Sequence, residues 1–155
     1  MTYCIEGLDP APYRELTALA DDALQARGVH RMAVTDRPGF PCRVTLDECA
    51  VGESVLLLNH ASRTGDTPYR ATHAIFVGER SAEAGVFVDE VPPVMRQRLL
   101  SLRGFDAQGM MVDALIAQPG EADAGLRRLF ADPAVTDVDV HNATRGCFAA
   151  RARRA

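Results

Sequence analysis

The sequence predicts an α+β fold with a largely antiparallel (mixed) sheet of about seven to nine strands and two main helices. Segments with a hydrophobic period of two, which is typical of strands, outnumber segments with helical spacing. Most of them follow one another with only turn residues between, which leaves no room for the crossover helices of a parallel sheet. The 155 residues contain no evident linker or repeat, so we expect one domain spanning residues 1–155.

The first 28 residues are expected to form a short strand followed by a helix. Residues 2–6 predict the strand. Asp9 and Pro10 predict the start of the helix, because aspartate caps helix N-termini and proline fits the first turn. Leucines and alanines at helical spacing continue it towards Gly28, which suits the position just after a helix.

The middle of the chain has the pattern of consecutive strands separated by turn residues. The predicted strands are 29–35, 42–46, 53–59, 72–77, 86–88, 98–105 and 110–117, the last two forming a hairpin around residues 106–109. A second helix is predicted over 121–131, with acidic residues at its start and basic residues near its end, as the helix dipole favours. Two further strands, 136–142 and 146–151, are expected to form a C-terminal hairpin.

The C-terminal hairpin suggests a catalytic pair. Apolar alternation predicts that Val140 pairs with Phe148, and this register sets His141 opposite Cys147 with their Cβ atoms about 4.5–5.5 Å apart. A base beside a thiol activates it, and Asp139 on the same face could orient the imidazole. An ordinary solvated sheet face with a surface salt bridge explains the same alternation.

Other candidates flank the predicted strands. Two prolines and a glycine in residues 38–41 form a rigid turn that would present Cys42 or Arg43 in a defined direction. Cys42 is expected on a core-facing side, as a buried thiol or a nucleophile, whereas Arg43 faces solvent or a pocket. Tyr69 and Arg70, at the start of a strand, could hold a planar or anionic ligand, or cover each other at the surface.

Cys42, His73, His141 and Cys147 have ligand types that suit zinc, but no two of them have the local spacing of a zinc motif. A zinc-binding domain is therefore a third alternative, and no cofactor is expected. The four cysteines show no CxxC pattern and are expected to be reduced.

Composition excludes several classes of protein. All 17 basic residues are arginine, so Schiff-base and P-loop lysine chemistry is excluded, and any anion must be held by arginine or backbone amides. The net charge of −4 disfavours nucleic-acid binding, and no apolar run approaches the roughly 20 residues of a membrane-spanning helix. The N-terminus lacks signal-peptide features, so we expect a cytoplasmic protein with no membrane partner.

Three segments together resemble a known bacterial family. They are Pro38-Gly39-Phe40-Pro41-Cys42-Arg43, then Pro68-Tyr69-Arg70 with Ile75-Phe76-Val77, and His141-Asn142 with Gly146-Cys147-Phe148-Ala149-Ala150-Arg151. With residues 99–103 and 110–113 between them, the chain resembles the bacterial domain-of-unknown-function family 1203 over nearly its whole length. The resemblance implies a bacterial single-domain protein and implies no activity, cofactor or catalytic residue.

Two hypotheses of different classes follow. In the first, a sheet edge binds or transforms a small anionic or carboxylate-bearing ligand. The ligand would be bound by Arg43, Tyr69, Arg70 and Asn142, with His141 as acid or base and Cys147 or Cys42 as nucleophile. In the second, the chain is a non-catalytic interaction module or a homo-oligomer that docks a partner through exposed sheet edges.

Overall fold

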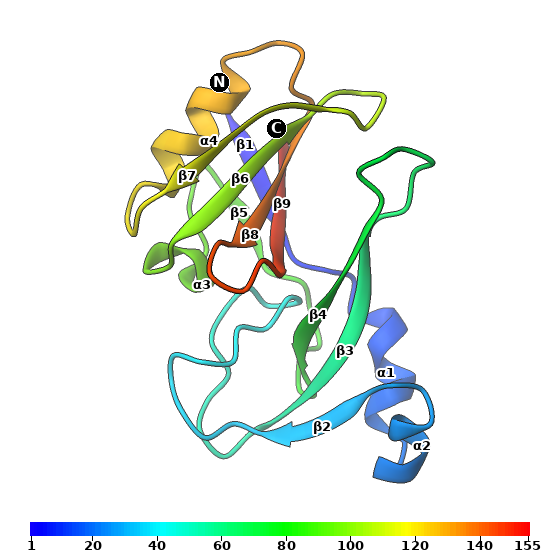
Figure 1. Cartoon of the computed structure of the whole chain (residues 1–155). Coiled ribbons are helices and arrows are strands. Elements are labelled where there is room, and N and C mark those ends of the chain that lie inside the picture. Colours follow the sequence, from blue (N-terminus) through cyan, green and yellow to red (C-terminus); the bar gives the residue numbers. More distant parts are fainter.

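The computed structural model describes residues 1–155, and their strands form two separate antiparallel sheets (Figure 1). The larger has six strands in the order β5-β1-β9-β8-β6-β7, and the smaller has three in the order β2-β3-β4. The strands are β1 (Tyr3–Glu6), β2 (His30–Ala33), β3 (Ser54–Arg63), β4 (Ala71–Gly78), β5 (Val86–Val88), β6 (Leu100–Phe105), β7 (Met111–Ala117), β8 (Asp137–Asn142) and β9 (Phe148–Arg154). The helices are α1 (Ala11–Thr17), α2 (Asp21–Gln25), α3 (Pro93–Arg96) and α4 (Ala122–Phe130).

The α+β class is confirmed, with three differences in detail. The strands divide between two sheets, and the predicted first helix is interrupted between α1 and α2. The predicted strand at 42–46 is wrong, because this segment folds into turns that make only isolated bridges at Pro41 and Cys42. No helix is both long and apolar enough to cross a membrane.

Each sheet has its own hydrophobic cluster. On the six-stranded sheet, Leu126, Leu129 and Phe130 of α4 are buried in one cluster with Leu102 and Val140. A second cluster lies against the three-stranded sheet and includes Leu24 of α2. Apolar burial on this scale is the main stabilising contribution to a domain of this size. The opposite face of the six-stranded sheet is therefore free to meet the smaller sheet.

The predicted register of the C-terminal hairpin is wrong by two residues on β9. Val140 pairs with Ala150, and a β-bulge after it places His141 opposite Phe148 rather than Cys147. The turn is longer than expected, because Gly146 adopts a left-handed conformation (φ +77°) and donates a hydrogen bond of 2.7 Å to the Asn142 carbonyl. For the pairs before the bulge, a shift of two residues keeps the side chains on their predicted faces, so the hydrophobic pattern could not detect it.

The polar face of β8 is buried, so the alternative of an ordinary solvated sheet face is wrong. Asp139 is 1% exposed and lies between the two sheets. It accepts hydrogen bonds from Arg63 at the end of β3 (2.7 Å) and from Arg151 of β9 (2.6 Å). A buried charge requires such partners. This cluster therefore joins the sheets and brings β4 towards the β8–β9 turn.

Candidate functional site

A pocket of about 810 Å³ lies where the β8–β9 turn meets β4 and the segment before β3. Apolar side chains of β3 and β4, among them Leu57 and Ile75, form part of its wall. Its charged, thiol, imidazole and amide groups come from Arg43, His73, Arg98, Asn142, Arg145 and Cys147. We call it the thiol pocket. It brings together three of the residues predicted from the sequence, Arg43, Asn142 and Cys147.

Arg43 links the segment before β3 to the β8–β9 turn. Its side chain is almost entirely buried and donates hydrogen bonds to the Phe148 carbonyl (2.8 Å), the Pro41 carbonyl (2.7 Å) and Cys147 Sγ (3.2 Å). Burial is the largest effect on this guanidinium and lowers its pKa, whereas the neighbouring Cys147 raises it. Arginine stays charged in such places, so Arg43 brings a fixed positive charge to the sulfur.

Two glycines hold the segment that carries Arg43. A β-carbon on Gly7 would lie 1.8 Å from the Val44 carbonyl oxygen, and one on Gly85 would lie 2.2 Å from the Thr45 carbonyl oxygen. This close approach allows a backbone hydrogen bond in which Gly85 N–H donates to the Val44 carbonyl at 2.9 Å. The absence of side chains at both glycines lets residues 43–45 lie against β1 and β5.

The β8–β9 turn positions Cys147. Backbone hydrogen bonds close the turn, from Asn142 N–H to the Cys147 carbonyl at 2.9 Å and from Ala143 N–H to the Leu99 carbonyl at 3.0 Å. The Asn142 side-chain amide donates to Cys147 Sγ at 3.3 Å, so the sulfur accepts hydrogen bonds from both Asn142 and Arg43. Asn142 Oδ1 is buried without a partner and remains free to accept a hydrogen bond from a ligand.

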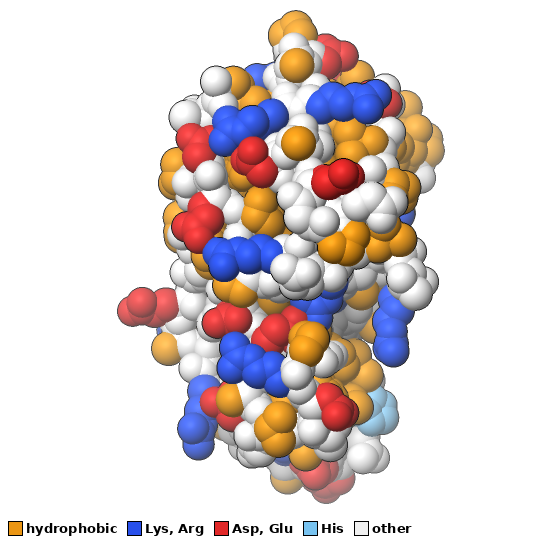
Figure 2. Space-filling model, turned by 90° about the vertical axis from the view of Figure 1, so that its left-hand side faces the viewer, with side chains coloured by type: hydrophobic (Ala, Val, Ile, Leu, Met, Phe, Trp, Pro, Cys, Tyr) orange, Lys and Arg blue, Asp and Glu red, His pale blue; other side chains and the backbone are white.

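The thiol pocket has an excess of positive charge. It is lined by three arginines and no carboxylate. Arg98 forms an ion pair with Glu48, which lies outside the lining, whereas Arg145 is exposed and has no ion-pair partner. Elsewhere the charges are mixed, as Figure 2 shows for one face of the molecule, where acidic and basic side chains are interspersed. The pocket is therefore suited to a small anion.

The imidazole in the pocket wall is His73 rather than His141. His141 is 2% exposed, and its Nδ1 lies 3.0 Å from the Gly146 carbonyl. Burial lowers its pKa to about 4, so it is neutral at physiological pH. His73 packs against it with ring centroids 4.9 Å apart, and its own pKa is also lowered by burial. His73 Nε2 is buried without a hydrogen-bond partner.

The structure places the other predicted residues elsewhere. Tyr69 packs edge-on against Phe105 with ring centroids 5.6 Å apart, and Arg70 is exposed in the β3–β4 connection. Cys42 is buried, and its sulfur lies 3.0 Å from Ser81 Oγ. The zinc alternative is not supported, since no three His, Cys, Asp or Glu side chains gather as ligands of one ion.

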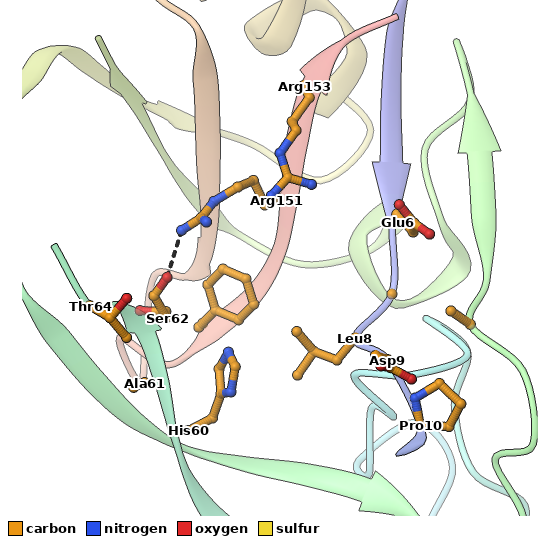
Figure 3. Close-up of a pocket in the computed structure, with 13 residues that line it drawn as sticks. Glu6, Leu8, Asp9, Pro10, His60, Ala61, Ser62, Thr64, Arg151 and Arg153 are labelled. Atoms are coloured by element: carbon orange, nitrogen blue, oxygen red, sulfur yellow. Dashed lines mark hydrogen bonds between the residues drawn. The ribbon is translucent and has the colours of Figure 1, made fainter. Parts of the chain in front are cut away.

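A second pocket of about 560 Å³ lies where β3, β9 and the segment between β1 and α1 meet (Figure 3). Its lining carries both signs of charge, with Arg151 and Arg153 from β9 and Glu6 and Asp9 from the other side. Arg151 is already engaged, because it donates to the Ser62 carbonyl at 2.7 Å as well as to Asp139. This pocket contains no cysteine, so the thiol pocket is the better candidate for chemistry.

Sequence reasoning missed Arg98, Arg145 and the pocket position of His73. Arg145 carried one local signal, because a basic residue in the turn before Gly146-Cys147 must lie near that thiol. Arg98 had none, since it precedes a strand that is far from Arg43 in sequence. Because His73 shares strand parity with Ile75 and Val77, the sequence predicts a hydrogen-bonded, semi-buried ring. The exposure of His73 is intermediate, as predicted, but its Nε2 has no hydrogen-bond partner.

The family model described as "Protein of unknown function (DUF1203)" matches residues 39–154, so the chain belongs to this family. No curated protein matches the chain, and neither does any solved structure. The matched region includes all the thiol-pocket residues named above. The family is of unknown function, so the chemistry must be inferred from the site itself.

Proposed function

We propose that this protein binds a small carboxylate-bearing anion in the thiol pocket. One observation carries the proposal: three arginines and no carboxylate line the pocket beside a cysteine that accepts hydrogen bonds from Arg43 and Asn142. Arginine holds carboxylates through paired N–H groups. We assign the main contact to Arg145, because the guanidiniums of Arg43 and Arg98 are already partly used within the protein.

We propose that Cys147 is the reactive group of the pocket. A thiolate is the nucleophilic form of cysteine, and it accepts hydrogen bonds from a guanidinium and an amide more strongly than a thiol does. Among the pocket residues, His73 has a free Nε2 and is the candidate acid or base. His141, favoured by the sequence, would act through contact with His73 rather than on a ligand.

Thermal unfolding with dicarboxylates tests the binding. Succinate should raise the melting temperature of the protein, and neutral succinamide should not. Arg145→Ala should abolish most of the shift, since it removes the unpaired cation of the pocket. Arg80→Ala is the matched control, because Arg80 is also exposed but lies outside the pocket. An equal shift in both variants, or none in the wild type, would overturn the proposal.

Alkylation tests the thiol. Iodoacetamide at neutral pH should label Cys147 first, and Cys147→Ala should remove this fast labelling. Cys4→Ala is the control, because Cys4 is also part-exposed but its sulfur has no hydrogen-bond partner. Labelling that is unchanged in Cys147→Ala would contradict the assignment.

We also propose that the protein acts in the bacterial cytoplasm. The four cysteines are free, and reducing compartments preserve free thiols. Fractionation of a bacterial host in which the chain is a native gene product would test the location. Recovery of the protein in the periplasm would contradict it.

One observation favours the alternative of an interaction module. β7 is an edge strand, and its Val112 and Ile116 side chains are 38% and 56% exposed. Unpaired strand edges with apolar side chains can pair with a second copy. Light scattering would then show a mass that rises with concentration, and Ile116→Lys would suppress the rise.

A further inference from the structure

Cys42 and Cys49 lie together outside the thiol pocket. Neither sulfur belongs to the lining of that pocket, and both residues are buried, with 1% and 7% exposure. They sit on the two sides of a short loop in which Cys42 N–H donates to the Asp47 carbonyl (2.9 Å) and Cys49 N–H donates to the Phe40 carbonyl (3.0 Å). Nothing in the proposed anion site requires these two thiols.

Gly78, at the end of β4, lies beside both sulfurs. A β-carbon built on Gly78 would lie 3.2 Å from Cys49 Sγ and 3.6 Å from Cys42 Sγ. The two sulfurs thus share one small volume that the glycine leaves free. A disulfide forms only between neighbouring cysteines, with β-carbons about 3.5–4.5 Å apart.

Hydrogen bonds distinguish the two thiols. The Cys42 sulfur accepts a hydrogen bond from Gly78 N–H at 3.3 Å and lies 3.0 Å from Ser81 Oγ. The neighbouring Cys49 thiol is the largest influence on Cys42 and lowers its pKa against the effect of burial, whereas the Cys42 sulfur and burial raise the pKa of Cys49. Of the two thiols, Cys42 is therefore the one that loses its proton more readily. This arrangement supplies both a nucleophilic sulfur and a proton donor.

We propose that Cys42 and Cys49 are a dithiol that hydrogen peroxide oxidises reversibly to a disulfide. The Cys42 thiolate attacks one peroxide oxygen, the O–O bond breaks, and the leaving oxygen takes the proton of Cys49 to form water. Cys42 is then a sulfenic acid, and the Cys49 thiolate attacks its sulfur and releases hydroxide. The two sulfurs lose two electrons in total, and the peroxide gains them.

The Cys42 sulfur contacts the turn that follows β4. Ser81, whose hydroxyl contacts the sulfur, is only part-buried and follows the turn after β4. Its two neighbours along the chain, Arg80 and Ala82, are both exposed. We place the route of the oxidant at this turn, and the 1% exposure of Cys42 restricts it to a molecule as small as hydrogen peroxide.

Peptide mapping tests the proposal cleanly because trypsin places each cysteine on its own peptide. Cleavage at arginine, blocked between Arg37 and Pro38, gives peptides 1–14, 32–43, 44–63 and 146–151 with one cysteine each. The reduced full-length protein is treated with hydrogen peroxide, blocked with N-ethylmaleimide and digested without reductant. We expect peptides 32–43 and 44–63 to be joined, and dithiothreitol to separate them.

Variants define the roles of the two thiols. Cys49→Ser should lose the linked peptides and leave a sulfenic acid on peptide 32–43 that dimedone traps. Cys42→Ser should lose both products, and Cys147→Ser should retain the linkage, which separates this proposal from the anion site. Wild-type protein that gives no linkage, or that links peptide 146–151 or 1–14 instead, would overturn it, whatever the variants do.

Discussion

Arg63 at the end of β3 donates a hydrogen bond of 2.7 Å to the carboxylate of Asp139 on β8, so a nearly buried ion pair joins the two sheets. Arg63 also lies over the Phe105 ring, with its guanidinium carbon 3.3 Å from the ring centroid. This contact helps to hold the smaller sheet, and with it β4 beside the thiol pocket, against the larger one.

Removal of the Asp139 carboxylate should therefore lower the free energy of unfolding. Asp139→Ala removes the buried acceptor of Arg63 and Arg151 and leaves Asp137 as the one carboxylate that pairs with both. We expect the free energy of unfolding to fall by about 3 kcal/mol or more, as for other broken buried pairs. Denaturation by urea measures it, with Asp66→Ala in an exposed loop as the control. A loss equal to that of the control would show that the sheets are joined by other contacts.

Acid should destabilise the protein through His141. Its pKa is about 4 in the folded chain, chiefly because of burial, with Arg103 and His73 adding to the effect and Gly146 and Asp139 opposing it. The unfolded chain binds the proton with a pKa of about 6.5, so this contribution is complete above pH 6.5 and is lost as the pH falls towards 4. It amounts to roughly 3 kcal/mol at most.

Unfolding free energies measured between pH 4 and 7 test the effect of His141. His141→Gln should flatten the decline, whereas His30→Gln, at an exposed site on β2, should not. Some decline should remain, because burial also lowers the pKa values of His60 and His73. An unchanged slope in His141→Gln would mean that the buried ring is protonated without penalty.

A methyl group at Gly7 should disturb the thiol pocket from a distance. The new carbon would overlap the Val44 carbonyl oxygen, which is backbone and has no flexible side chain to move aside. We expect Gly7→Ala to cost more than about 2 kcal/mol, as overpacking does at its upper range, and to weaken succinate binding. Gly65→Ala is the control, since its nearest atom would be 3.9 Å away. Wild-type affinity in a folded Gly7→Ala would show that residues 43–45 adapt.

Elements specified by neighbouring residues could be predicted from the sequence. The β6–β7 hairpin follows from two strand segments around residues 106–109, where Gly109 has φ +78°, and α4 follows from acidic residues at its start and basic residues near its end. The faces of β8 also followed from alternation, because Val138 and Val140 are buried as expected. Each of these needs information from only a few adjacent turns or strands.

Features that depend on distant contacts could not be predicted. Cys42, Val44 and Leu46 alternate like a strand and are all buried, but hydrogen bonds with Leu8 and Gly85 hold the segment in turns. The thiol pocket needed the crossing of β4 over the β8–β9 turn, which no local pattern encodes. For the same reason the sequence could not predict that His73, rather than His141, lines the thiol pocket.

The strand order has a consequence for how the chain folds. β1 pairs with β9 through partners such as Ile5 and Ala152, which are far apart in sequence, whereas β2, β3 and β4 are consecutive in sequence. Contacts between distant segments slow folding, and domains form in the order of synthesis on the ribosome. The three-stranded sheet can therefore assemble early, while β1 must wait for the last strand before its edges are covered. We expect nascent chains that stop before β8 to expose β1 and to need chaperones.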